Sequence, residues 1–181
     1  SDVYKRQALL RSYCHDIVTP FSDMALRNVP TIESWSIPHN EYEARRSFSA
    51  FTLNGRGPRQ VAFSVDLHGS NSFTIGVHVA DITYFLQANS ALDREARRRG
   101  ASVHLVQESF EMLPPDLLRI AALHVNSDAL AKSVVFTFQS DRVVDIWIGR
   151  SIVHVKHMTS HAELDRVLLG EATSFPVAPD A

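Results

Sequence analysis

Alternating apolar and polar positions dominate the middle of the chain and predict β-strands. Residues 61–67 alternate most cleanly, with apolar side chains at the odd positions and small or acidic ones at the even positions. Gly69-Ser-Asn71 is typical of a turn, so 73–79 is expected to return as the second arm of a β-hairpin. The same patterns predict further strands at 47–53, 102–106, 133–138, 143–148 and 151–155.

Helical periodicity is confined to short segments that have clear start and stop signals. Ser90 is placed to cap a helix over 92–99, which Gly100 would end. Ser160-His-Ala-Glu163 has the spacing of a capping box and opens a helix through Leu169. Shorter helices are predicted over 8–15, 22–26 and 116–123.

Strands outnumber helices, and tight turns join them. The pattern therefore predicts an α+β fold with a mixed, largely antiparallel β-sheet core flanked by helices. A length of 181 residues suits one domain that buries a sizeable core. Hydrophobic residues make up 45% of the chain and charged residues 21%, which is ordinary for a globular protein.

Charge and cysteine content narrow the possible functions. The formal net charge is −2, so any affinity for nucleic acid must come from a local basic patch. The one cysteine, Cys14, cannot form an internal disulfide and favours a reducing, cytoplasmic location. No apolar run approaches the ~20 residues that a membrane-spanning helix needs, so we expect no membrane partner.

Four short motifs follow one another between Gly76 and Leu113. They read Gly76-Val-His-Val-Ala-Asp81, Leu92-Asp-Arg-Glu-Ala-Arg-Arg-Arg-Gly100, Ser102-Val-His-Leu105 and Met112-Leu-Pro114. In wording and spacing they resemble the catalytic RNB domain of the ribonuclease II and ribonuclease R exoribonucleases. That family reads G-V-H-I-A-D, L-D-x-E-A-x-x-R-G, S-V-Y-L and M-L-P at these places. His78 and Asp81 of the first motif are expected to be structural hydrogen bonders.

The resemblance extends from Trp35 to Leu168, because Trp35-Ser-Ile-Pro38 and Asp145-Ile-Trp-Ile-Gly-Arg150-Ser also match family segments. The tryptophans in both segments are interpreted as core residues. The family's domain is about twice as long as this chain. The resemblance thus implies a helical or irregular lead-in over 1–44, whose first residues match nothing in the family, the N-terminal half of an RNB domain over 45–170, and an irregular tail over 171–181.

In this family, four aspartates in the pattern T-I-D-(x)n-D-x-D-D-A-L-S-V hold Mg²⁺, and the enzymes remove nucleotides one at a time from the 3′ end of RNA. Mg²⁺ is a hard cation that carboxylates and water retain. The metal polarises the phosphoryl oxygen and activates the attacking water. The resemblance therefore places the chemistry in the segment that here runs from Thr52 to Val65.

That segment contains no carboxylate. Asn54 stands at the first aspartate, and Gln60 and Val61 stand at the last two when Ala62-Phe-Ser-Val65 is aligned with A-L-S-V. An ungapped register places Gln60, Ala62 and Phe63 there instead. In either register, no Asp or Glu occurs between Glu43 and Asp66. We therefore predict a degenerate site without catalytic residues and without the Mg²⁺ of active members.

Arginines provide positive charge near the segment where active family members carry the negative charge of their aspartates. Four arginines near the degenerate site could hold phosphates by bidentate hydrogen bonds, namely Arg45, Arg46, Arg56 and Arg59. A solvated loop is an equally good reading of any one of them. His104 replaces the family's tyrosine of S-V-Y-L and could stack on a base, or be a strand residue without a role.

Other basic features have plainer interpretations. Arg97-Arg-Arg99 would point in three directions from a helix, which favours a solvated face. His154, His157 and His161 have a metal-like spacing but straddle a strand, a turn and a helix cap, which disfavours a zinc site.

The sequence thus favours an RNA-binding pseudo-exoribonuclease whose partner is single-stranded RNA, with messenger RNA as the expected class. Its other expected partners are the missing C-terminal half of the domain and the flanking oligonucleotide-binding barrels of a full protein. An active Mg²⁺-dependent 3′→5′ exoribonuclease and a protein-interaction scaffold are the alternatives.

Overall fold

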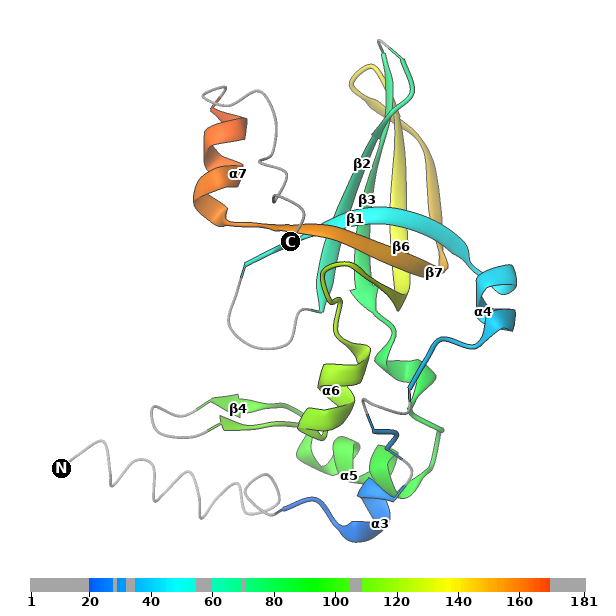
Figure 1. Cartoon of the computed structure of the whole chain (residues 1–181), viewed down its shortest axis with the longest axis vertical. Helices are drawn as coiled ribbons and strands as arrows, with labels where there is room; N and C mark the ends of the chain where they lie inside the picture. The colour runs from blue at the N-terminus through cyan, green and yellow to red at the C-terminus, as the bar shows by residue number, and fades with distance from the viewer. Residues whose placement is uncertain are drawn as a thin grey trace, which may run out of the picture. The chain divides into compact units, whose positions relative to one another are not determined.

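The computed structural model describes residues 20–27, 29–31, 35–54, 60–69, 71–104 and 109–169. These residues form two compact units with interleaved sequences (Figure 1). One unit draws on Ser1–Trp35 and Ile82–Ile120, and the other on Ser36–Asp81 and Ala121–Ala181. The helix predicted over 8–15 lies outside the described residues.

The second unit is a closed five-stranded barrel in the order β1-β2-β3-β6-β7. Neighbouring strands are antiparallel except at the seam, where β1 runs parallel to β7. This confirms the mixed, largely antiparallel sheet and both predicted hairpins. The strands are β1 (Arg46–Leu53), β2 (Val61–Leu67), β3 (Ser72–Ala80), β6 (Ser127–Gln139) and β7 (Arg142–Thr159).

Strand β7 corrects one prediction. The segments 143–148 and 151–155 were expected to be separate strands, but they are parts of one strand of 18 residues. Gly149 and Arg150 continue the pairing with β6 instead of interrupting it. The extra length lets the first part of β7 pair with β6 while its last part, from Ser151 to Thr159, pairs with β1. The long strand therefore closes the barrel.

The barrel interior contains small residues around one imidazole. His78 of β3 is fully buried, and its ring nitrogens hydrogen-bond Ser64 Oγ of β2 at 2.9 Å and Ser133 Oγ of β6 at 2.6 Å. Ser133 in turn bonds Ser151 of β7, and the Phe48 ring of β1 lies 5.1 Å from the imidazole. One side chain thus links all five strands, as expected for a structural role.

Gly76 shows how tightly this interior is filled. A Cβ atom at this position would come within 2.7 Å of His78 Nε2, and it would also collide with the Ser64 hydroxyl. Glycine is therefore required at position 76 by close packing, because its φ angle is not in the left-handed region.

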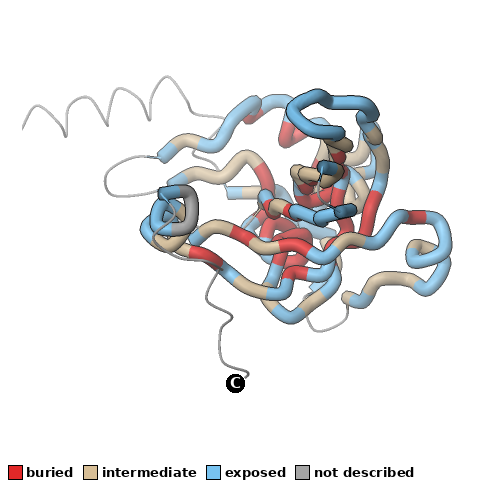
Figure 2. Tube along the Cα trace, turned by 90° about the horizontal axis from the view of Figure 1, so that it is seen from above, coloured by how far each residue is buried: buried red, intermediate tan, exposed pale blue. Residues whose placement is uncertain are grey.

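The apolar side of β2 and of its partner β3 faces outward. Cross-strand pairing aligns the odd residues of β2 with apolar residues of β3, β6 and β7, as in the row Val65, Ile75, Phe136 and Ile146. We call the exposed members of this face the outer wall; they are Val61, Val65, Leu67, Val79, Ile146 and Ile148. Val65 is 54% exposed and Ile148 74%. Figure 2 shows that the chain trace carries both buried and exposed stretches.

The first unit is mainly helical. Ser22 caps α3 (Asp23–Leu26) and Ser90 caps α5 (Ala91–Arg99), which ends at Gly100 with a φ angle of 71°. Trp35 packs against Tyr84 and Phe85 but is half-buried, so the predicted core role describes only part of its environment. The remaining elements are the 3-10 turn η1 (Ile82–Tyr84), β4 (Val103–His104), β5 (Ser109–Phe110) and α6 (Pro115–Ala121).

The core of this unit lies between its helices and consists of Ala25, Leu92, Ala96, Leu113, Leu117 and Leu118. Two helices flank the barrel strands in sequence, namely α4 (His39–Ala44) and α7 (His161–Leu168). At the start of α7, Ser160 and Glu163 exchange hydrogen bonds as the predicted capping box. None of the helices in the described residues is long and apolar enough to cross a membrane.

The buried imidazole makes the stability of the barrel depend on pH. Burial lowers the pKa of His78 from 6.5 to about 4, although Asp66 acts in the opposite direction. Between pH 6.5 and about pH 4, His78 is protonated in the unfolded chain and neutral in the folded chain. The free energy of unfolding therefore falls as the pH drops from 6.5 towards about 4, by on the order of 3 kcal/mol from this group.

Urea unfolding across this pH window should show a steeper dependence for the native chain than for His78→Gln, which retains hydrogen-bonding groups but does not titrate. The same slope in both proteins would contradict a neutral, buried His78.

Candidate functional site

The positions of the missing aspartates lie at one end of the barrel, where β1 ends and β2 begins. The pairing of Thr52 with Ala62 brings these strand ends together. The backbone N–H of Asn54 donates to the carbonyl of Thr159 at 2.8 Å, and the carbonyl of Gln60 accepts from the N–H of Ala80 at 2.8 Å. Backbone groups therefore fix both positions, whichever side chain they carry.

The donor set at this end does not fit Mg²⁺. Asn54 is exposed, Gln60 is half-buried and Val61 is 40% exposed, and none of them carries a charge. Neutral amides are weak replacements for the carboxylates that retain Mg²⁺. Across the described parts of the chain, there is no group of three or more His, Cys, Asp or Glu side chains that could hold a metal ion.

Two carboxylates of the barrel strands and their ends, Asp66 and Asp81, cannot supply the missing charge. Asp66 lies five residues along β2 from Val61, which is about 16 Å in a strand. Asp81 follows β3 at the correct end, but its side chain is fully buried and forms an ion pair with Arg45 at 2.9 Å. Neither of these two carboxylates therefore completes a metal site at the barrel end.

Arg45 is a structural residue, and this corrects its proposed role as a phosphate ligand. Its side chain is 1% exposed and pairs with Asp81 and with Glu41 of α4. The guanidinium also donates to the carbonyl of Ala131 in β6 at 3.4 Å. A phosphate cannot reach a guanidinium that is enclosed in this way, so Arg45 is removed from the candidates.

Arg46 remains accessible. It is exposed at the start of β1, and its guanidinium carbon lies 4.6 Å from the centroid of the Trp147 ring. The Trp147 ring lies 5.6 Å from that of Phe48. Trp147 is half-buried, so the predicted core role describes only part of its environment. A cation beside an aromatic ring is an arrangement that can contact both phosphate and base.

The other sequence candidates are dispersed. His104 is exposed on the β4–β5 ribbon of the first unit, where its Nδ1 hydrogen-bonds Ser109 Oγ at 3.1 Å. Arg56 and Arg59 lie outside the described residues. Of the three histidines with metal-like spacing, His154 bonds Asp128 at 2.7 Å, and His157 stacks on Phe51.

A cavity of about 230 Å³ beside the β1–β7 seam was not foreseen from the sequence. Its lining includes Ser49, Phe51, Asp66, Lys156 and His157. The rings of Phe51 and His157 stack with an interplanar angle of 11° and a centroid distance of 5.7 Å. These residues come from strands about 100 positions apart that pair in parallel, so no local pattern could have joined them.

The fold and the motifs at the barrel end agree with the comparison to known families. The RNB domain model matches residues 45–179, and the chain belongs to the RNB domain family. DIS3-like exonuclease 2 of Schizosaccharomyces pombe is 32% identical over 162 residues, which cover 85% of this chain and 17% of that protein. The chain thus spans about a sixth of the length of the curated relatives that it matches.

Two solved structures give the same fold. Yeast Ssd1, a pseudonuclease, has a TM-score of 0.69 and 26% identity, over 77% of this chain and 18% of that one. Ribonuclease R of Mycoplasma genitalium, in complex with ribose-methylated single-stranded RNA, has a TM-score of 0.78 and 16% identity, over 98% of this chain and 28% of that one. The family therefore includes proteins named as nucleases and as pseudonucleases, so membership does not decide activity.

The two adjacent arginines should differ sharply when replaced. Arg45→Met leaves the Asp81 carboxylate buried without its partner and should lower the free energy of unfolding by about 3–5 kcal/mol. Arg46→Gln removes an exposed cation beside Trp147 and should lower it by no more than about 1 kcal/mol. Urea unfolding of both variants measures the difference.

The double variant Arg45→Met/Asp81→Leu removes both charges and should recover much of the stability lost in Arg45→Met. Equal stability of Arg45→Met and Arg46→Gln would contradict the structural role of Arg45.

Proposed function

We propose that this chain is an RNA-binding domain that binds single-stranded RNA, with messenger RNA as the expected class, and does not hydrolyse it. One observation carries the second half of the proposal: no carboxylate occupies positions 44–65, where the family's metal ligands belong. The described residues hold no alternative metal cluster. Without a bound cation, no group at the barrel end can activate water or stabilise the leaving oxygen.

Exposed basic and aromatic groups support RNA binding. Arg46 beside Trp147 provides a cation and a ring on one surface. Arg56 and Arg59 add positive charge to the segment between β1 and β2, where active members have negative charge. Arginine binds phosphate through two parallel hydrogen bonds, and aromatic rings stack on bases without sequence preference. His104 is a further stacking candidate on the other unit.

The relatives support both parts of this proposal. Ribonuclease R is solved with single-stranded RNA, and yeast Ssd1 is described as a pseudonuclease. A domain that retains the family's fold but lacks the metal ligands would hold an RNA strand by its phosphates and bases. Asn54 and Gln60 could still exchange hydrogen bonds with ribose or phosphate, since amides both donate and accept.

The outer wall supports a further contact with protein. Its exposed apolar residues lie across paired strands, and an exposed apolar patch often marks a protein contact. The relatives are several times as long as this chain, since a match over 85% of it covers 17% of the S. pombe protein. We propose that the remaining half of an RNB domain packs against the outer wall in a full-length protein, leaving the barrel end and the first unit for RNA. Flanking oligonucleotide-binding barrels would extend the RNA path.

A nuclease assay tests the absence of hydrolysis. The full-length protein is incubated with 5′-labelled single-stranded RNA and Mg²⁺, beside an active member of the family. We expect the RNA to stay intact while the control enzyme releases mononucleotides. Stepwise shortening of the RNA from its 3′ end by the full-length protein would refute the proposal in favour of an active exoribonuclease.

A binding titration on the same RNA tests the other half. Affinity should fall as salt is raised, because phosphate contacts release counterions. If the RNA is neither bound nor cleaved, the RNA-binding function is wrong and the protein-interaction scaffold takes its place.

A further inference from the structure

One cross-strand row of the outer wall carries two positive charges. The row consists of Val61, Val79, Lys132 and Arg150, which pair in turn across β2, β3, β6 and β7. All four residues are exposed. Lys132 and Arg150 stand directly opposite each other, so they share one face of the sheet, with Cβ atoms about 4.5–5.5 Å apart. We call these two residues the basic pair.

No acidic side chain compensates the basic pair within the residues that the structure describes. In that part of the chain, neither Lys132 nor Arg150 has an ion pair, a hydrogen bond or a ring contact. Two rows further along the same strands, by contrast, Asp128 stands opposite His154 and hydrogen-bonds its Nδ1 at 2.7 Å. Like charges directly opposite each other destabilise a sheet. The basic pair therefore costs the barrel stability unless a negative charge comes from elsewhere.

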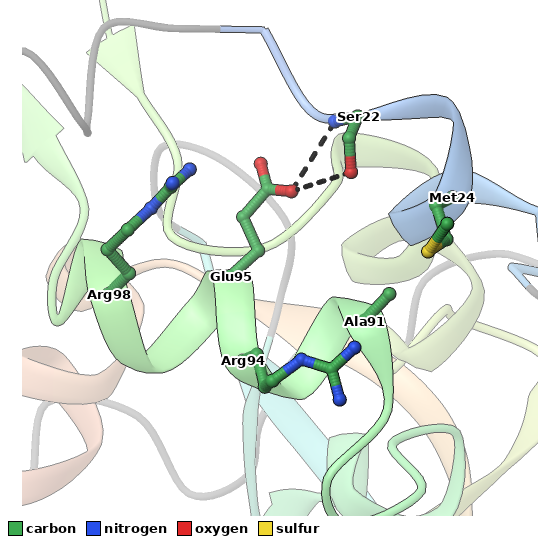
Figure 3. Close-up of a pocket in the computed structure, with 6 residues that line it drawn as sticks. All are labelled: Ser22, Met24, Ala91, Arg94, Glu95 and Arg98. Carbon is green, nitrogen blue, oxygen red and sulfur yellow. Dashed lines mark hydrogen bonds between the residues drawn. The ribbon is translucent and has the colours of Figure 1, made fainter.

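Arginines of the first unit show the compensated arrangement. In the pocket of about 330 Å³ between α3 and α5, Glu95 points at Ser22 and accepts from its hydroxyl at 3.0 Å (Figure 3). The other oxygen of Glu95 accepts from Arg99 at 2.8 Å. Arg94 of the same pocket donates to the carbonyl of Asn89 at 2.6 Å. These arginines have partners in their own unit, which distinguishes them from the basic pair.

Apolar residues surround the basic pair. Val79 precedes it in its own row, and the next row places Val134 opposite Ile148, which is 74% exposed. The row on the other side contains Leu130 and Ile152, which are buried. A surface that covers Val79 and Ile148 would also exclude water from the two cations, and a buried cation without a partner is strongly unfavourable. Whatever covers this part of the wall must therefore supply a negative group.

A carboxylate on a protein surface fits these surroundings best. A carboxylate accepts hydrogen bonds at two oxygens, so one acidic side chain can bridge a lysine and an arginine. The aliphatic side chains of Val79, Val134 and Ile148 match the apolar part of such a surface. They offer no ring that could stack on a base, and stacking is the usual companion of phosphate contacts to single-stranded RNA.

We propose that the basic pair binds an acidic side chain of the remaining half of an RNB domain, when that half packs against the outer wall in a full-length protein. This inference rests on the protein contact proposed for the outer wall and adds the charge pattern of the docking surface. That surface carries apolar residues against Val79, Val134 and Ile148 and a carboxylate over the basic pair. The pair also fixes the register of docking, because a shift of one row would bury two cations without a partner.

Lysine acetylation of the full-length protein tests whether this part of the wall is covered. Lys132 is one of three lysines in these 181 residues, and Lys156, which is exposed on β7, is the internal control. Each rate is measured by mass spectrometry relative to the urea-unfolded protein. Without RNA, Lys132 should react about tenfold more slowly than Lys156, because a covered ammonium reacts only after local opening.

Equal relative rates would show an uncovered wall and would overturn both this proposal and the wall contact on which it rests. Protection of Lys132 that appears only when RNA is added would assign the basic pair to phosphate, and protection that grows with protein concentration would assign it to a second copy of the chain. Either result would also overturn the proposal.

Thermal unfolding of full-length variants tests the acidic partner. Lys132→Gln/Arg150→Gln leaves the docked carboxylate buried without a cation and should lower the Tm by on the order of 5 °C. A pair without an acidic partner predicts the opposite sign, because the same variant removes a repulsion. Lys132→Arg/Arg150→Lys retains both charges and should retain the wild-type Tm. Lys156→Gln is the matched control and should leave the Tm unchanged.

Protection of Lys132 together with an unchanged or raised Tm in the double glutamine variant would mean that the wall is covered without an acidic contact. The proposal would then fail while the wall contact stands. The RNA-binding function is decided separately by its own titration.

Discussion

The hydrogen bonds of His78 inside the five-stranded barrel are the contact on which the rest of this structure depends. The imidazole is surrounded by the hydroxyls of Ser64 and Ser133, by the Phe48 ring and by Gly76, where a Cβ atom would collide with it. Ser64 and Ser133 satisfy both ring nitrogens, so the imidazole can stay neutral and buried. The buried Arg45–Asp81 ion pair joins the start of β1 to the end of β3, and Arg45 also contacts Glu41 of α4 and the Ala131 carbonyl of β6.

Local signals in the sequence predicted the local structure well. The β2–β3 hairpin, the Ser90 cap and the capping box at Ser160 all depend on residues that lie close together in the chain, and all are present. The parallel seam between β1 and β7 was not predictable in this way, because its partners are about 100 residues apart. The burial of Arg45 was not predicted from the sequence for the same reason. Its partner Asp81, whose charge makes the burial of Arg45 tolerable, lies 36 residues away.

The predicted alternation of β2 is confirmed, but this alternation does not predict which face points into the barrel. A period of two identifies which side chains share a face and does not say which face is inside. Here the interior accommodates Ala62 and Ser64, and Val65 and Leu67 point outward. The hydrophobic pattern did not indicate a role for His78 and Asp81. The family motif did, because it marked both as structural hydrogen bonders.

The barrel fold does not depend on carboxylates at positions 54, 60 and 61, because backbone atoms hold the strand ends whereas side chains would hold a metal. Asn54 and Gln60 contribute backbone hydrogen bonds to the strand ends, and their side chains contribute little to the core. Mn²⁺ titration of the metal-free full-length protein, followed by the electron paramagnetic resonance of the free ion, tests this account most directly, since Mn²⁺ prefers the same oxygen ligands as Mg²⁺. The account predicts no saturable site in the native protein and a gain of Mn²⁺ affinity in Asn54→Asp/Gln60→Asp/Val61→Asp. A tight, stoichiometric Mn²⁺ site in the native protein would contradict it.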